Sequence, residues 1–326
     1  MQSLSILGVS LPFPGAIPLD DSVHIPVLSR PILELGNPQP GEFWVDGTAG
    51  GGGHSRLIAE HLGASGRLLA LDRDPAAILR LKENLPAHGK AHHASYDTLP
   101  QLLEELNWPL VDGILLDLGL SSDQLADQDR GFSFQTHGDL DMRFDPTQGE
   151  AAWEWLERVD ESQLADAIFE FGEERFSRRI ARRIVEQRKI SPLRKADELR
   201  ELIYRCVPKG AGRSQRHGRI DPATRTFQAL RIVVNRELDI LTNALQLLPG
   251  CLKIGGKLLI ISFHSLEDRR VKHAFREDQR LEVITRRPIQ ADEDEVGINP
   301  RSRSAKLRIA RRILPAEPIL APKRHN

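Results

Sequence analysis

Short runs rich in aliphatic residues alternate with longer amphipathic stretches along much of the chain. Four of these runs end at an aspartate or a serine: residues 43–45 before Asp46, 67–71 before Asp72, 111–116 before Asp117 and 257–261 before Ser262. Runs this apolar are typical of parallel strands that are buried on both faces. Their alternation with helical stretches predicts a doubly wound α/β sheet.

A long gap in this alternation indicates an insertion. About 140 residues lie between Asp117 and Lys257, far more than one crossover helix requires. We interpret residues 128–220 as an inserted helical domain. Within it, three apolar residues recur at every fourth position and predict a helical stripe: Phe176, Ile180 and Ile184. Five arginines fall on the other faces of that helix: Arg175, Arg178, Arg179, Arg182 and Arg183.

The remaining patterns complete the predicted organisation. The chain divides into a flexible N-terminal arm (1–22), a first part of the sheet domain (23–127), the helical insert (128–220) and a second part of the sheet domain (221–326). Within the insert, residues 208–219 are rich in glycine and arginine and are expected to form a flexible basic loop. Near the end of the chain, residues 281–287 and 306–313 are expected to pair as an antiparallel edge of the sheet.

Charge is distributed unevenly, although the net charge is only −1. Residues 1–174 hold 10 lysines and arginines against 29 acidic residues, residues 175–225 hold 16 against 5, and residues 298–326 hold 8 against 1. This separation favours one region that binds a cationic or hydroxyl-bearing ligand and another that faces a polyanion such as a nucleic acid. The alternative is that the two kinds of segment merely neutralise each other across the fold.

Cysteine use and hydropathy narrow the class of protein. The two cysteines, Cys206 and Cys251, lie far apart and lack the spacing of metal ligands. This argues against a disulfide framework and a zinc site and fits a reducing cytoplasm. The chain also lacks the pattern of a signal peptide and any apolar run long enough to span a bilayer. We therefore expect a cytoplasmic protein without a metal site or a membrane partner.

The candidate binding site follows the ends of the predicted strands. Residues 46–54 form a glycine-rich turn between a strand and a helix, where backbone N–H groups approach an anionic ligand closely. Asp72 ends the second strand, at the position of an acceptor for ribose hydroxyls. Asp117 ends the fourth strand, and Tyr96 after the third is a candidate cover for an adenine ring, with edge packing as the alternative. NAD and S-adenosylmethionine share the ribose, but acidic side chains at this edge favour a sulfonium cation over a pyrophosphate.

Ten motifs, in their order along the chain, resemble those of the ribosomal RNA small subunit methyltransferase H family. The resemblance extends from His24 over nearly the whole remaining chain. It is carried by DGT at 46–48, GGH at 52–54, LDRDP at 71–75, GILLDLG at 113–119, RGFSF at 130–134, LDMR at 140–143, FGEERF at 171–176, PATRTFQA at 222–229, ISFHSLEDR at 261–269 and NPRSRS at 299–304.

The resemblance implies a class I (Rossmann-like) S-adenosylmethionine-dependent methyltransferase sheet with an inserted helical domain. It implies N4-methylation of a cytidine in the decoding region of 16S ribosomal RNA, within the small ribosomal subunit, and it says nothing of oligomeric state. Carried over by position, the cofactor contacts are Gly52, Gly53, His54, Asp72, Tyr96, Asp117 and Gln124.

The chemistry of an exocyclic amine calls for a hydrogen-bond acceptor, because the amine lone pair is delocalised into the ring. Candidates are Asp117, which is also the candidate catalytic residue, the Leu118 carbonyl and the hydroxyls of Ser121 and Ser122. Two insert aromatics, Phe132 and Phe134, are candidates to stack on an extruded base, with core packing as an equal alternative. Residues 262–268 are expected to border the substrate pocket or to cap a helix.

Three other functions remain as alternatives. A DNA or protein methyltransferase is compatible with the basic insert, although the family motifs argue against it. An NAD-dependent oxidoreductase is disfavoured by the acidic cofactor edge. The third is a ribosome-assembly factor that holds S-adenosylmethionine without catalysis.

Overall fold

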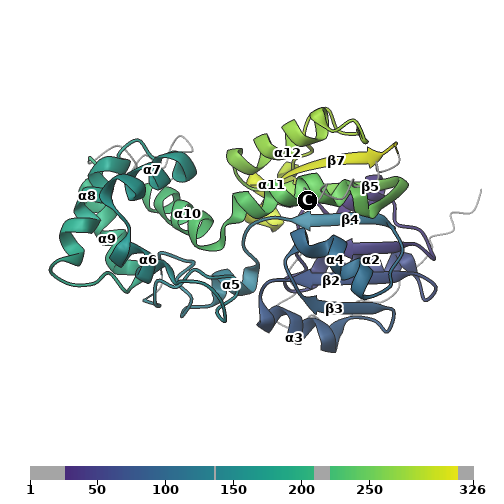
Figure 1. Cartoon of the computed structure of the whole chain (residues 1–326), viewed down its shortest axis with the longest axis horizontal. Helices are drawn as coiled ribbons and strands as arrows, with labels where there is room; N and C mark the ends of the chain where they lie inside the picture. The colour runs from purple at the N-terminus through teal and green to yellow at the C-terminus, as the bar shows by residue number, and fades with distance from the viewer. Residues whose placement is uncertain (1–25, 136, 209–220, 315–326) are drawn as a thin grey trace, which may run out of the picture.

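The computed structural model describes residues 26–135, 137–208 and 221–314, and it shows a sheet domain joined to a helical lobe (Figure 1). The predicted N-terminal arm (1–22) and nearly all of the predicted basic loop (208–219) lie outside the described residues. The helical lobe is attached beside α5 and α10 (Figure 1). The sheet domain and the lobe each have their own apolar core.

The sheet has seven strands in the order β3-β2-β1-β4-β5-β7-β6. Strands β1 to β5 pair in parallel, and β7 is antiparallel to both β5 and β6. The bounds are β1 (Phe43–Asp46), β2 (Arg67–Asp72), β3 (Gly89–His93), β4 (Val111–Asp117), β5 (Leu252–Ser262), β6 (Leu281–Val283) and β7 (Lys306–Arg312). This confirms the predicted α/β sheet and its antiparallel edge. The strand order reverses between β1 and β4, and in such a sheet this reversal places a crevice at the carboxyl ends of those two strands.

Helices cover both faces of the sheet because successive strand side chains point to opposite faces. On β2, Leu69 and Leu71 pack with α4 and α11, whereas Leu68 packs with α2. Gly113 on β4 lies beneath the indole of Trp44, where a Cβ would be 2.4 Å from the ring. The covering elements are α1 (Ser29–Pro31), the π-helical turn η1 (Ile32–Gly36), α2 (Gly53–Leu62), α3 (Pro75–Asn84), η2 (Tyr96–Thr98), α4 (Leu99–Glu105), α11 (Glu237–Cys251) and α12 (Ser265–Glu277).

The helical lobe has its own buried core. After α5 (Ser122–Ala126), it consists of α6 (Ala152–Arg158), α7 (Glu161–Gly172), α8 (Ser177–Arg188), α9 (Ala196–Cys206) and α10 (Pro222–Asn235). In α8 the predicted stripe is present, because Ile180 and Ile184 are fully buried and Phe176 packs against the same core. Phe227 and Leu230 of α10 belong to this core as well. We therefore propose that the insert continues through α10, past the predicted boundary at residue 220.

The connection from β6 back to β7 folds over the edge of the sheet domain. It contains α13 (Glu293–Ile298) and the 3₁₀ turn η3 (Pro300–Ser304). The Glu295 carboxylate accepts a hydrogen bond from the Leu28 backbone N–H at 2.6 Å, which ties this connection to the start of the described chain. No helix in the described ranges combines the length and apolar character that crossing a bilayer requires. The same ranges contain no group of three or more His, Cys, Asp or Glu side chains placed to hold a metal ion.

Candidate functional site

A cleft lies at the carboxyl ends of the parallel strands, where the sequence places its candidate residues. Six of the seven predicted cofactor contacts line it: Gly53, His54, Asp72, Tyr96, Asp117 and Gln124. Gly52 does not, because it sits behind the loop as the residue that precedes α2. Its φ of 79° is left-handed, and a Cβ there would be 2.8 Å from Leu81, so the turn requires glycine.

The glycine-rich loop is held from below by a buried aspartate. The Asp46 carboxylate accepts hydrogen bonds from the Thr48 N–H at 3.2 Å and from the Ser55 hydroxyl at 2.6 Å. Burial raises the pKa of Asp46 to about 6, although both hydrogen bonds oppose the shift. Asp46 therefore fixes the loop rather than touching a ligand, and α2 begins at Gly53 with its N-terminus directed to the cleft.

Asp117 lines the cleft beside His54. The Asp117 backbone N–H donates to the Thr48 hydroxyl at 2.6 Å, and its Oδ2 lies 3.5 Å from His54 Nδ1. His54 is oriented by a contact of 2.8 Å between its Nε2 and the Val27 carbonyl. Among the described residues, Asp117 Oδ1 has no hydrogen-bond partner. Burial raises the pKa of Asp117 to about 6, opposed by His54, so this carboxylate is suited to receive a donor from a ligand.

Asp72 is held in place by backbone amides. Its Oδ2 accepts from the Gly50 N–H and its Oδ1 from the Asp74 N–H, each at 2.7 Å. A carboxylate has about four acceptor sites, so two bonds leave room for hydroxyl donors from the cleft. Burial raises the pKa of Asp72 to about 6, and the two backbone hydrogen bonds lower it only in part.

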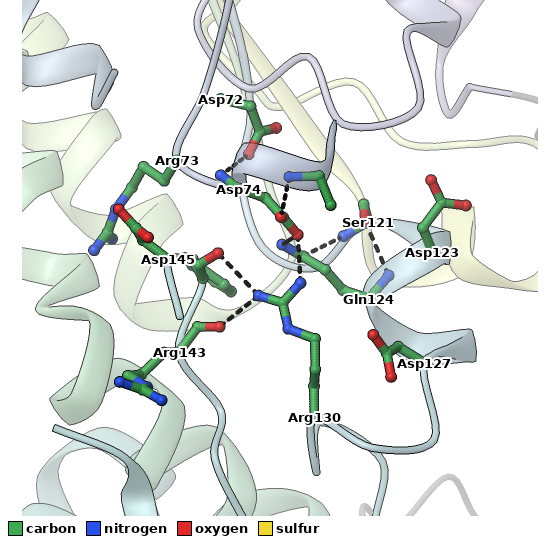
Figure 2. A network of polar contacts seen from close by, with 12 residues as sticks. Asp72, Arg73, Asp74, Ser121, Asp123, Gln124, Asp127, Arg130, Arg143 and Asp145 are labelled. Atoms are coloured by element: carbon green, nitrogen blue, oxygen red, sulfur yellow. Dashed lines mark hydrogen bonds and ion pairs between the residues drawn. The ribbon is translucent and has the colours of Figure 1, made fainter. Parts of the chain in front are cut away.

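Gln124 and Asp74 connect this edge of the cleft to the insert (Figure 2). The Gln124 side chain accepts from the Ser121 N–H at 3.0 Å and donates to Asp74 Oδ2 at 3.5 Å. The Arg130 guanidinium also donates to Asp74 Oδ2 and continues to the carbonyls of Arg143 at 2.6 Å and Phe144 at 2.9 Å. Asp74 is almost fully buried, so its charge requires this partner. The turn that carries Asp72 is thereby fastened to the insert.

Another part of the cleft wall contains a buried ionic cluster. Glu237 pairs with the Arg231 guanidinium at 2.7 and 2.9 Å. Glu267 accepts a hydrogen bond from the Phe263 N–H at 2.9 Å. Burial alone would raise the pKa of Glu267, but the nearby His264 and Arg231 side chains lower that pKa overall. Of residues 262–268, Phe263 and Glu267 line the cleft, and Glu267 caps α12, which begins at Ser265. That these residues border the substrate stays a prediction.

Tyr96 is almost fully buried against this wall. Only 9% of its surface is exposed, and burial raises the pKa of its phenol above the usual range. It therefore stays neutral and does not act as a base in the cleft. Both expectations for Tyr96, packing at the sheet edge and contact with an adenine, are compatible with this position.

Several lining residues escaped the sequence analysis as ligand contacts. They are Phe144 of the insert, Glu237 and Leu241 of α11, and Asn299 and Arg301 near η3. The last two lie in the NPRSRS motif, and the Arg301 guanidinium reaches across to donate to the Ser122 hydroxyl. Conversely, Phe132 and Phe134 pack in the insert core, against Phe144 and Phe227 respectively, and neither lines the cleft.

Comparison with known proteins gives consistent matches over most of the chain. The model of the MraW methylase family matches residues 21–313. The chain is 47% identical over 305 residues to the ribosomal RNA small subunit methyltransferase H of Rhodopirellula baltica, covering 90% of this chain and 92% of that protein. It is 43% identical over 322 residues to the protein of the same name from Sorangium cellulosum, covering 98% of this chain and 100% of that one.

Likeness to solved structures is weaker. An rRNA methylase from Streptococcus thermophilus matches with a TM-score of 0.40 and 10% identity, covering 86% of this chain and 92% of that one. NSun6 from Pyrococcus horikoshii, solved with the ligand SFG, matches with a TM-score of 0.44 and 13% identity, covering 89% of this chain and 53% of that one.

Proposed function

Because the chain belongs to the MraW methylase family, we propose that it methylates the exocyclic N4 amine of a cytidine in the decoding region of 16S ribosomal RNA. The cofactor is S-adenosylmethionine, and the substrate is RNA of the small ribosomal subunit, which the curated relatives are named for. We expect it to act in the cytoplasm on RNA within the subunit.

The cofactor fits the cleft by the chemistry of its parts. Asp72, with two acceptor sites still available, suits the ribose hydroxyls. The N-terminus of α2 at Gly53 and His54 suits the methionine carboxylate, because the first turn of a helix has free N–H groups. Tyr96 and Gln124 border the nucleoside, while Gly52 shapes the loop from behind.

The Asp117 carboxylate is the main support for an amine as the methyl acceptor. Its Oδ1 lacks a partner among the described residues and lies at the strand end where the methyl group must be delivered. An amine N–H that donates to this oxygen gains electron density as it attacks the methyl carbon, and general-base help of this kind supplies typically about 10²–10⁴-fold. Phe263, which packs beside Gly119, is placed to stack on the target base.

The residues that line the cleft disfavour methylation at a pyrimidine ring carbon. That reaction uses a covalent nucleophile, for which cysteine is the usual side chain. Neither cysteine of the chain lines the cleft, and both Cys206 and Cys251 are buried elsewhere. Burial raises the pKa of both thiols, which makes them poor nucleophiles.

Mass spectrometry of 16S ribosomal RNA from a deletion strain tests the proposal. We expect N4-methylcytidine to disappear from one fragment of the decoding region and to return when the wild-type gene is restored. The Asp117→Asn gene serves as the matched control and should not restore it. Persistence of N4-methylcytidine in the deletion strain, or loss of a different methylated nucleotide, would contradict the proposal. An unchanged set of modifications would favour an assembly factor.

A further inference from the structure

One residue of the predicted insert (128–220), Phe144, lines the cleft in the part of the chain that the structure describes. Its ring lies 5.8 Å from that of Phe132, at an interplanar angle of 29°, and the Arg73 guanidinium lies 5.6 Å from its centre. Phe144 is therefore more than a neighbour of the cleft, because it is packed between the insert core and the residue that follows Asp72.

The backbone of Phe144 is fixed from both sides. Its N–H donates to Asn235 Oδ1 at 2.7 Å, and its carbonyl accepts from Arg130 at 2.9 Å. Asn235 in turn donates to the Met142 carbonyl at 2.7 Å. Arg130 connects this segment to Asp74 (Figure 2). A ring held this way loses little conformational freedom when a flat ligand packs against it.

The position of Phe144 along the sheet edge shows which part of a ligand it meets. Arg73 follows β2, and Asp145, the residue after Phe144, contacts His93 at the end of β3 at 3.2 Å. Phe144 thus lies near the carboxyl ends of β2 and β3, whereas Asp117 ends β4. The order β3-β2-β1-β4 puts two strand spacings, about 10 Å, between β2 and β4.

The covalent structure of the cofactor indicates which of its groups Phe144 contacts. The adenine is attached to C1′ of the ribose, and the sulfonium is attached to C5′ beyond C4′, so the two groups extend from opposite ends of the ring. With the ribose at Asp72 and the methyl group directed to Asp117, the adenine extends away from β4, toward β3. We propose that Phe144 packs against this adenine, so that the insert supplies one wall of the cofactor site. The inference rests on the proposed role of Asp72.

Binding measurements on the full chain test this contact. Stacking of a base on an aromatic ring is worth about 1–3 kcal/mol, so Phe144→Ala should weaken S-adenosylmethionine binding by about 5- to 150-fold. The same reduction is expected for 5′-methylthioadenosine, which has the adenine and ribose but lacks the amino-acid end. Phe144→Trp should restore most of the affinity for both ligands. Phe169→Ala, which removes an exposed aromatic of the insert, is the matched control and should change neither affinity.

The outcomes separate this inference from the proposed site. Phe144→Leu keeps an apolar side chain, and a melting temperature near wild type shows that the variant is folded. If Asp72→Ala weakens binding while folded Phe144→Ala and Phe144→Leu bind S-adenosylmethionine normally, the adenine contact is overturned and the proposed site stands. If those Phe144 variants instead raise KM for the RNA alone, Phe144 contacts the substrate, which also overturns it. If neither Asp72→Ala nor Phe144→Ala affects cofactor binding, the proposed site itself fails.

Discussion

The sheet edge and the outer face of α8 hold their charged side chains in different ways. At the sheet edge, carboxylates lie in a cleft and are held by backbone N–H groups, as Asp72 is by Gly50 and Asp74. On α8, arginine side chains stand in solvent. Arg182 is 70% exposed and lies 3.6 Å from Glu161, and Arg183 is 57% exposed and pairs with Glu186 at 2.9 Å.

The difference follows from the ligands that each region is proposed to meet. A small cofactor must be held in one geometry, so its partners are fixed in advance and shielded from water. A polyanion presents many equivalent phosphates, and each contact releases counterions wherever it forms. Exposed pairs such as Arg183 with Glu186 are worth little to stability, so these arginines exchange partners at small cost.

The strongest test of the sheet edge is Asp117→Asn. The amide keeps the shape of the carboxylate but is a weaker acceptor, so turnover at saturating S-adenosylmethionine should fall by about 10²–10⁴-fold. Single-turnover kinetics beside a calorimetric titration checks this. Asp123→Asn is the matched control, because that carboxylate also lines the cleft but pairs with Arg80. Reduced cofactor affinity with normal saturating turnover would make Asp117 a cofactor ligand only.

Removal of the ribose acceptor should have the next largest effect. Asp72→Ala deprives two hydroxyl donors of a charged acceptor, and such bonds are worth about 1.5–3 kcal/mol. We expect S-adenosylmethionine affinity to fall about ten- to a hundredfold in a titration calorimeter. Asp72→Asn still accepts from the Gly50 amide and should lose less. Unchanged affinity in a folded Asp72→Ala protein defeats the assignment.

The arginine face is tested by changing four residues together to glutamine: Arg178, Arg179, Arg182 and Arg183. Glutamine preserves helix propensity, and the buried stripe of α8 is untouched. S-adenosylmethionine affinity should stay near wild type, while RNA or subunit affinity falls. The slope of log K against log salt should become shallower by about 0.7–0.9 for each phosphate that the protein no longer neutralises.

The matched control for this variant replaces the same four arginines by lysine, which keeps the charge and should keep the salt slope. An unchanged slope in the glutamine variant would show that this face is merely solvated. The basic segments 208–219 and 298–326 of the sequence would then be the better candidates for contact with RNA.

The smallest expected effect is a pH dependence confined to the sheet edge. Burial raises the pKa of Asp72 and of Asp117 to about 6. If the cofactor binds the ionised carboxylates, as we propose, its affinity should fall as the pH drops through 6. At pH 5.5 the loss relative to pH 7.5 is about fourfold if one carboxylate must be ionised and about fifteenfold if both must be. Titrations over this range check it, and Asp72→Asn should flatten the dependence. RNA affinity through arginines should not share it.

Much of the fold was predictable because its signals are local. The apolar runs that end at Asp46, Asp72 and Asp117 became β1, β2 and β4, and their carboxyl ends meet at one edge. Residues that follow parallel strands therefore gather in the cleft without any knowledge of loop paths. The buried stripe of α8 was also predictable from local sequence, since helical periodicity appears in residues that are only three or four positions apart.

The contacts that escaped prediction depend on distant packing. Phe144 reaches the cleft through Arg130 and Asn235, which come from separate parts of the chain. Its sequence neighbourhood looks no different from that of Phe132, which is buried in the insert core. Apolar periodicity likewise identifies α10 as an amphipathic helix but does not say which of the two cores its side chains enter.

The length of the insert has a consequence for biosynthesis. Strand β5 pairs with β4 in the middle of the sheet, yet about 140 residues of chain separate them. At a synthesis rate of about 5–20 residues per second, β4 waits about 7 to 28 s for this partner. During that time its apolar edge is open to wrong pairings. The insert, with its own core, can fold first on the ribosome, and we expect mutations that destabilise that core to lower the yield of folded protein through aggregation before they affect methyl transfer.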